Sequence, residues 1–68
     1  MYEVYVVHSG KRALIGRRYN RYDARNLATV AAQRRELDGL CIISPHGYDE
    51  NYTREQALAI DNRLTTRG

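Results

Sequence analysis

The 68-residue chain has no tryptophan or phenylalanine, and it has one cysteine and one proline. A single cysteine excludes an intramolecular disulfide and suits a reducing compartment. No apolar run is longer than residues 40–43, far short of the ~20 residues of a membrane-spanning helix. The first residues show a strand pattern and no apolar signal region, so we expect a cytoplasmic protein that does not contact a membrane.

Sequence motifs of catalytic, metal-binding and nucleotide-binding sites are also missing. We find no zinc-finger cysteine spacing, phosphate-loop glycines, nucleophile elbow or aromatic signature strands of RNA-recognition domains. Cys41 lies within an apolar run and reads as a core residue. His8 and His46 follow two different strands and would share a sheet edge if those strands were parallel neighbours. That is a weak hint of an acid–base pair, and we expect no enzyme, no metal and no cofactor.

The composition is that of a folded protein, with 43% apolar and 28% charged residues, and the length predicts a single domain over residues 1–68. Residues 2–7 and 13–19 alternate like strands and predict an antiparallel hairpin with a loop of about five residues. Gly16 in the second strand marks a bulge or a close backbone approach.

A helix is expected next, with Asp23 as its cap and an alanine-rich stripe that runs to about Asp38. Gly39 would end it in a left-handed conformation. Residues 40–44 predict a third strand, and Pro45–Asn51 a polar loop.

Thr53 and Gln56 have capping-box spacing and predict a second helix to about Leu64. Residues 65–68 are expected to fray. The order β-β-α-β-α predicts an α+β fold with a three-stranded sheet and both helices on one face. The third strand would lie parallel to the first if the two are neighbours. The other face of the sheet would be open or would meet a partner.

Arginine is abundant, because it supplies ten of the eleven cations. Residues 11–25 hold six cations, two tyrosines and one acid. The first 35 residues carry eight cations against two acids, and the remainder carries three cations against six acids. The protein therefore has either a basic and an acidic face, or two halves that neutralise each other when folded.

Positive charge interleaved with tyrosine suits a surface that binds phosphate or an acidic partner. The sequence predicts a small, basic, non-enzymatic module that contacts nucleic acid or a ribonucleoprotein through the hairpin and the turn after it. An open sheet face with tyrosine and arginine is suited to single-stranded nucleic acid. The expected binding residues are Tyr5, Lys11, Arg12, Arg17, Arg18, Tyr19, Arg21, Tyr22 and Arg25.

The alternative is a protein-binding inhibitor or adaptor that blocks a nucleic-acid-handling complex of the host. Tyr48 and Tyr52, on the loop after the third strand, are the further candidates, because tyrosine offers a large contact area at low entropic cost. In size and compactness the chain resembles the small accessory proteins of phages and mobile elements, including anti-CRISPR proteins. A homodimer is also compatible with the open sheet and the oppositely charged halves.

Overall fold

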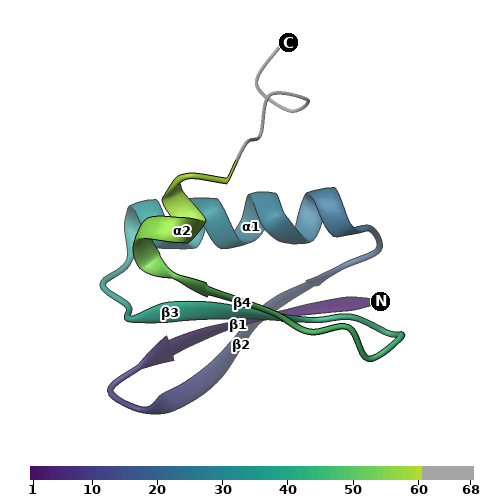
Figure 1. Ribbon diagram of the computed structural model, residues 1–68, viewed down its shortest axis with the longest axis horizontal. Helices are drawn as coiled ribbons and strands as arrows, with labels where there is room; N and C mark the ends of the chain where they lie inside the picture. Colours follow the sequence, from purple (N-terminus) through teal and green to yellow (C-terminus); the bar gives the residue numbers. More distant parts are fainter. Residues whose placement is uncertain (61–68) are drawn as a thin grey trace, which may run out of the picture.

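The computed structural model describes residues 1–60 as a four-stranded sheet with two helices, an α+β fold as the sequence predicted (Figure 1). The expected fraying of residues 65–68 lies outside the described residues. The elements are β1 (Tyr2–His8), β2 (Lys11–Arg18), α1 (Arg21–Arg34), β3 (Gly39–Ile43), β4 (Glu50–Thr53) and α2 (Arg54–Leu58).

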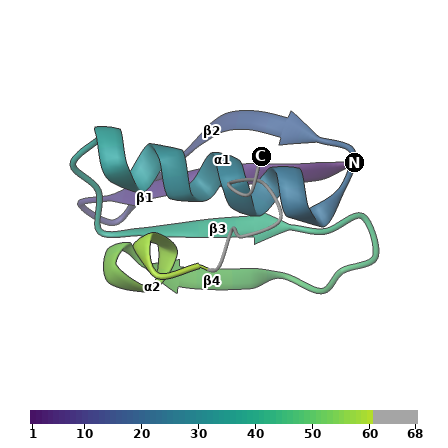
Figure 2. The same cartoon turned by 90° about the horizontal axis from the view of Figure 1, so that it is seen from above.

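The sheet has the order β2-β1-β3-β4, and every neighbouring pair is antiparallel. The predicted parallel pairing of the first and third strands is therefore wrong. Helix α1 carries the chain back to the end of the sheet where β2 began, so β3 runs in the direction of β2. Strand β1 lies between them and opposes both (Figure 2).

The β1–β2 hairpin was predicted correctly, but its loop is shorter than expected. Only Ser9 and Gly10 connect the strands, with φ angles of 53° and 78°. Two successive positive φ values match the right-handed twist of a hairpin. The turn is attached to the rest of the fold, because the N–H of Ser9 donates to the Asp38 carboxylate at 2.9 Å.

A bulge in β2 confirms the expected irregularity near Gly16. Val4 pairs with Gly16 and Tyr5 pairs with Leu14, so Ile15 is the extra residue. The bulge shifts which side chains of the strand lie on each face of the sheet: Leu14 lies on the open face, and Gly16 lies against α1. A Cβ at Gly16 would come within 2.9 Å of Leu27.

Helix α1 starts two residues before the expected cap. Asn20 is the N-cap: its side-chain oxygen accepts from the N–H of Asp23 at 2.8 Å, and its amide donates to the Asp23 carboxylate at 3.0 Å. Asp23 is thus the third helical residue. The helix ends at Arg34 and not near Asp38, and Gly39 belongs to β3, so it does not end the helix.

The core lies between the sheet and the helices, which both cover the same face (Figure 1). Val4, Leu40 and Ile42 are its largest fully buried side chains. Alanines of α1 allow the helix to lie close to these strands; the buried ones are Ala24, Ala28, Ala31 and Ala32.

Strand β4 was missed, since the polar segment before it was expected to continue as a loop to Asn51. It pairs with β3 from Glu50 to Thr53, which adds the fourth strand. The capping box of α2 is confirmed, with Thr53 accepting from the N–H of Gln56 at 3.1 Å and Gln56 accepting from that of Thr53 at 2.9 Å. Helix α2 ends at Leu58, short of the expected Leu64.

Among residues 1–60, no helix combines the length and apolarity that crossing a bilayer requires.

Candidate functional site

The hairpin cations lie at both ends of β2. Lys11 and Arg12 adjoin the Ser9–Gly10 turn, and Arg17 and Arg18 lie at the far end of the strand. Arg17 faces the open side of the sheet opposite Glu3, with its Nε 3.2 Å from the carboxylate. Arg18 lies on the other face, where it lines a hollow beside α1. The two adjacent arginines therefore lie on opposite faces of the sheet.

Tyr5 lies on the open face, as expected, in the middle of the sheet. The guanidinium of Arg12 covers its ring at 5.6 Å from the centroid and also donates to Cys41 Sγ at 3.7 Å. Cys41, on the neighbouring strand, is 3% exposed. The hydroxyl of Tyr5 donates to Glu3 at 3.1 Å, and this hydrogen bond raises the pKa of Tyr5. The ring of Tyr5 is thus already stacked by a cation of its own chain.

Glu50 gathers two of the remaining arginines. Its carboxylate accepts from Arg21 Nε at 2.8 Å, from Arg25 Nε at 3.1 Å and from the Tyr52 hydroxyl. Burial alone would raise the pKa of Glu50, but the three donors outweigh it and the net pKa is lowered.

The pKa values of Tyr52 and Arg25 are raised. Burial, and then the hydrogen bond to Glu50, raise the pKa of Tyr52. For Arg25, burial acts to lower the pKa, and the contacts with Glu50 and Tyr52 overcome it to give a raised pKa. Tyr52 is half-buried and packs against the core, so it is less accessible than a recognition residue of an open loop would be.

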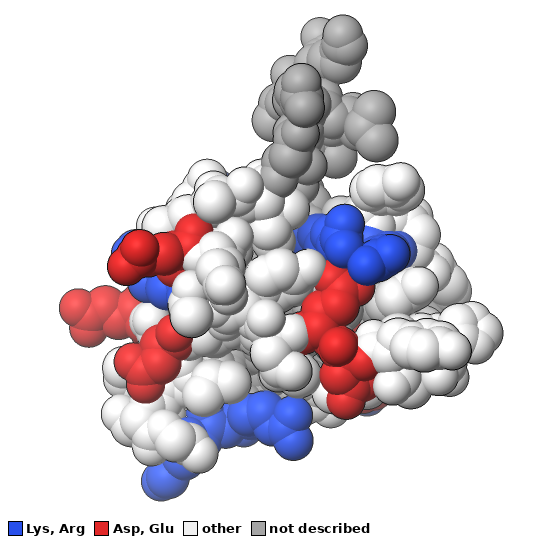
Figure 3. Space-filling model, in the orientation of Figure 1, with Lys and Arg blue, Asp and Glu red and all other residues white. Residues whose placement is uncertain are grey.

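The six predicted cations therefore do not form one patch. Arg17, Arg21 and Arg25 are in ion pairs with carboxylates of their own chain. The other three, which are Lys11, Arg12 and Arg18, have no carboxylate partner within residues 1–60, and they lie at two ends and on two faces of β2. Basic and acidic surfaces adjoin one another on the face shown in Figure 3.

The six tyrosines divide into a packed set and an exposed set. Tyr2, Tyr5 and Tyr52 lie on strands and are half-buried. The exposed set lies outside the sheet, with side chains that are 84%, 60% and 78% exposed for Tyr19, Tyr22 and Tyr48. Tyrosine combines a large apolar ring with a polar hydroxyl, a combination common at protein interfaces, so this exposed set is the candidate for recognition.

The three exposed tyrosines are at the same end of the molecule. Tyr19 follows β2, Tyr22 lies in the first turn of α1, and Tyr48 lies in the β3–β4 loop. These three segments meet at the end of the sheet where β1 begins (Figures 1 and 2). Tyr48 and Arg21 line one shallow hollow of about 410 Å³ there. We call this surface, with Tyr19, Tyr22 and Tyr48, the tyrosine end.

The loop that carries Tyr48 is held in place by Ser44. The Ser44 hydroxyl is buried and accepts from the N–H groups of His46 at 3.2 Å and of Tyr48 at 2.9 Å. The N–H of Gly47, with φ 84°, donates to the Ser44 carbonyl at 3.2 Å. These bonds order the backbone from Ser44 up to the tyrosine, which lowers the entropy lost when Tyr48 is immobilised by a partner.

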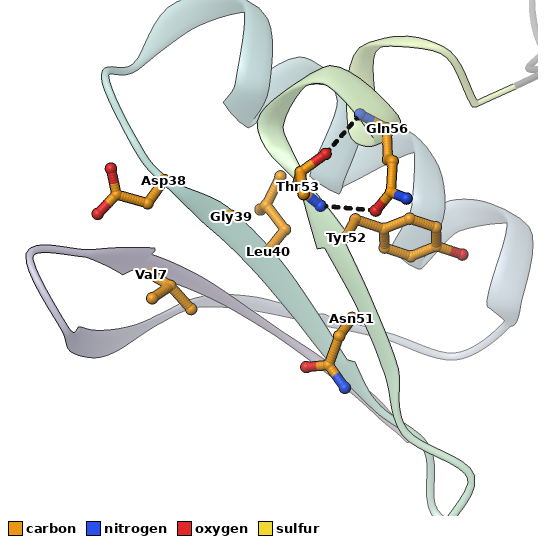
Figure 4. Close-up of a pocket in the computed structure, with 8 residues that line it drawn as sticks. All are labelled: Val7, Asp38, Gly39, Leu40, Asn51, Tyr52, Thr53 and Gln56. Carbon is orange, nitrogen blue, oxygen red and sulfur yellow. Dashed lines mark hydrogen bonds between the residues drawn. The ribbon is translucent and has the colours of Figure 1, made fainter.

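A second hollow lies at the other end of the sheet, over β3 and β4, with a volume of about 310 Å³ (Figure 4). Gly39 forms part of its wall. A side chain at this position would clash with the carbonyl oxygen of Tyr52, which would lie 2.7 Å from the added Cβ. The capping-box bonds of Thr53 and Gln56 occupy its rim. Its ionisable lining residues are Asp38 and Tyr52, and the Tyr52 hydroxyl is bonded to Glu50, so the hollow does not gather groups for acid–base chemistry.

The suggested histidine pair is not formed, because β1 and β3 are antiparallel. His8 ends β1 beside Glu36 and Asp38, whereas His46 follows β3 at the tyrosine end. Within the described part of the chain, no three histidine, cysteine or acidic side chains are placed to hold a metal ion.

No known protein family, curated protein or solved structure matches this chain. The site therefore has to be judged on its own geometry. The sequence named all three exposed tyrosines, with Tyr19 and Tyr22 in the hairpin and the turn after it and Tyr48 beside Tyr52 on a separate loop, and the structure places the three at one end. Their common feature, a place outside the sheet, was hidden for Tyr19, because the second strand was expected to run to this residue and ends at Arg18.

Proposed function

We propose that the protein is a non-enzymatic binding module that docks on a partner protein through the tyrosine end. The observation that carries this proposal is the convergence of Tyr19, Tyr22 and Tyr48, from three separate segments, on one end of the fold. Tyrosine and arginine are the residues most enriched where protein interfaces are energetically strongest. A docking surface of this kind is sufficient for an adaptor, or for an inhibitor that occupies a partner's functional surface.

The charge balance at the tyrosine end favours a protein over a polyanion. The arginines of this end are matched by the same number of acids: they are Arg17, Arg18, Arg21 and Arg25, beside Glu3, Asp23, Asp49 and Glu50. A phosphate backbone is bound by cations in excess, because affinity comes from the phosphates that they neutralise. A balanced aromatic surface instead suits a partner that offers an apolar pocket with polar groups around it.

Binding of nucleic acid is the second candidate, and Lys11 and Arg12 favour it. Both cations lack a carboxylate partner in the described part of the chain, and Arg12 lies on the open face of the sheet. A few free cations would give weak binding that falls by roughly 0.7 log units per log unit of salt for each phosphate neutralised on a single strand. Blocking a complex that handles nucleic acid is compatible with both candidates.

A capture experiment tests the proposed function. The protein is used as bait in lysate from its source organism, with and without nuclease, beside the triple variant Tyr19→Ala/Tyr22→Ala/Tyr48→Ala. We expect a partner that survives nuclease and is lost with the triple variant. Leu58→Ala is the control, since Leu58 is a 38% exposed apolar residue on α2, away from the tyrosine end. A partner that disappears with nuclease and is retained by the tyrosine variant would contradict the proposal.

A further inference from the structure

The sheet has two edges, and they differ in how well they are protected. Strand β4 is four residues long, and the outward N–H of Thr53 is occupied by the side chain of Gln56 at 2.9 Å. Strand β2 is eight residues long, contains no proline and pairs with β1 alone (Figure 2). Within residues 1–60, the backbone of β2 has one hydrogen-bond partner besides β1, which is the Arg18 guanidinium on the Arg17 carbonyl. An unpaired strand of this length is a template for another strand.

The bulge at Ile15 limits where a partner strand can pair regularly. The backbone bends there, so the straight part of the edge is the run Lys11–Leu14 next to the hairpin turn. All four residues of this run are exposed. It lies at the opposite end of β2 from the tyrosine end, so the two surfaces are separate.

The charge of the edge opposes pairing with a second copy of the chain. Strand β2 has two cations at each end and no acid. A second copy paired antiparallel over Lys11–Leu14 would set Lys11 opposite Leu14 and Arg12 opposite Ala13, so it would offer these cations no carboxylate. Pairing along the full length would set the cations at one end of β2 against those at the other end of its copy, and like charges directly opposite each other destabilise a sheet.

The positive charge of the β2 edge favours an incoming strand that carries acidic side chains. Lys11 and Arg12 point to opposite faces and have no carboxylate partner in the described region. Lys11 can meet an acidic side chain of an incoming strand directly, and Arg12 can do so by exchanging its contacts with the Tyr5 ring and Cys41 for a carboxylate. Leu14 is 41% exposed and offers an apolar contact on the face of Arg12. A matching segment would carry two adjacent acids followed or preceded by small or apolar residues.

We propose that the β2 edge, over Lys11–Leu14, binds an extended acidic segment of a partner protein as a fifth strand of the sheet. Backbone hydrogen bonds supply affinity in this mode of recognition, and alternate side chains supply specificity. Nucleic acid could satisfy the cations but has no peptide backbone to complete the sheet. This inference does not depend on the tyrosine end.

The test uses a short fluorescent peptide in which pairs of glutamates alternate with pairs of valines. Binding is measured by anisotropy, and hydrogen exchange is measured residue by residue. We expect binding that slows amide exchange within Lys11–Leu14 and is at least about tenfold weaker for both Lys11→Glu and Arg12→Glu. Because Arg12 stacks on Tyr5, the exposed Lys11 provides the variant that leaves the fold untouched. The triple tyrosine variant serves as the control and should bind the peptide like the wild type.

Three further probes separate strand pairing from simple charge attraction. The same peptide with N-methylated amides keeps its charge but cannot pair, and we expect it to bind at least about tenfold more weakly. The corresponding lysine–valine peptide should not bind. Equal binding of the methylated peptide, tighter binding of oligothymidine than of the acidic peptide, or no slowing of exchange in Lys11–Leu14 would each overturn the proposal. Failure of these probes leaves the capture experiment at the tyrosine end unaffected, so the two proposals fail separately.

Discussion

At the scale of single residues, Glu50 links distant parts of the chain. Its carboxylate joins the first turns of α1 to β4, through Arg21 and Arg25, and it also accepts from the Tyr52 hydroxyl on its own strand. The side chain of Glu50 is 17% exposed, and that of Arg25 is 28% exposed. Screening by water is therefore weaker than for a surface ion pair, and removal of the carboxylate leaves a half-buried guanidinium without its partner.

We predict that Glu50→Gln lowers the free energy of unfolding by about 1–2 kcal/mol at pH 7. The pKa of Glu50 is lowered in the folded state, so its contribution is present above the unfolded pKa of about 4.3 and is lost as the pH falls through the folded pKa. The difference between variant and wild type should therefore shrink as the pH falls below about 4. Urea denaturation at each pH measures it, with the exposed Glu55→Gln as control. A constant difference across this range would contradict the assignment.

Gly39 is required by its closeness to a neighbouring strand. A Cβ at this position would lie 2.7 Å from the carbonyl oxygen of Tyr52, which is held in the sheet (Figure 4). We predict that Gly39→Ala lowers the free energy of unfolding by about 1–3 kcal/mol, because a strand must move. In Gly47→Ala the new Cβ meets no atom within 4 Å, so the cost should come from the positive φ alone, about 1 kcal/mol. Thermal denaturation compares the two, and a Gly39→Ala variant as stable as wild type would refute the contact.

At the scale of elements, what could be predicted depended on local signals. The hairpin follows from alternation on both sides of Ser9–Gly10, and the start of α2 follows from the spacing of Thr53 and Gln56. Strand β4 has no apolar run and is stabilised by pairing with β3, which short-range patterns do not reveal. The direction of β3 was missed for a different reason. The crossover over α1 makes β3 parallel to β2, and β1 lies between them.

The start of α1 gives a test at this scale. We predict that Asn20→Ala lowers the free energy of unfolding by about 1 kcal/mol, since the N–H of Asp23 loses its acceptor. Asn20→Gly should cost only a few tenths of a kcal/mol, because glycine is itself a tolerated cap. Chemical denaturation of both variants and of Asp23→Ala measures the effects. If Asp23→Ala were the most destabilising of the three, Asp23 would be the cap, as the sequence suggested.

At the scale of the whole molecule, folding brings cations of the basic half of the chain against an acid of the acidic half. Arg21 and Arg25, in the basic first half, meet Glu50 in the acidic second half, so the halves neutralise each other in part. Folding also places the β3–β4 loop at the same end of the sheet as the β2–α1 turn, so Tyr48 shares this end with Tyr19 and Tyr22. The sequence left the first result as one of two alternatives and did not show the second, because both join residues more than twenty positions apart.

The central claim is that the partner binds at the tyrosine end. The most direct test is to measure the affinity of single tyrosine variants for the captured partner. Tyr19→Ala, Tyr22→Ala and Tyr48→Ala remove exposed side chains, so the variants should fold like the wild type. Isothermal titration calorimetry with the purified partner should show at least one of them binding about tenfold more weakly or worse, a loss of about 1.4 kcal/mol. Unchanged affinity in all three variants, together with binding lost in Arg12→Glu, would contradict the account.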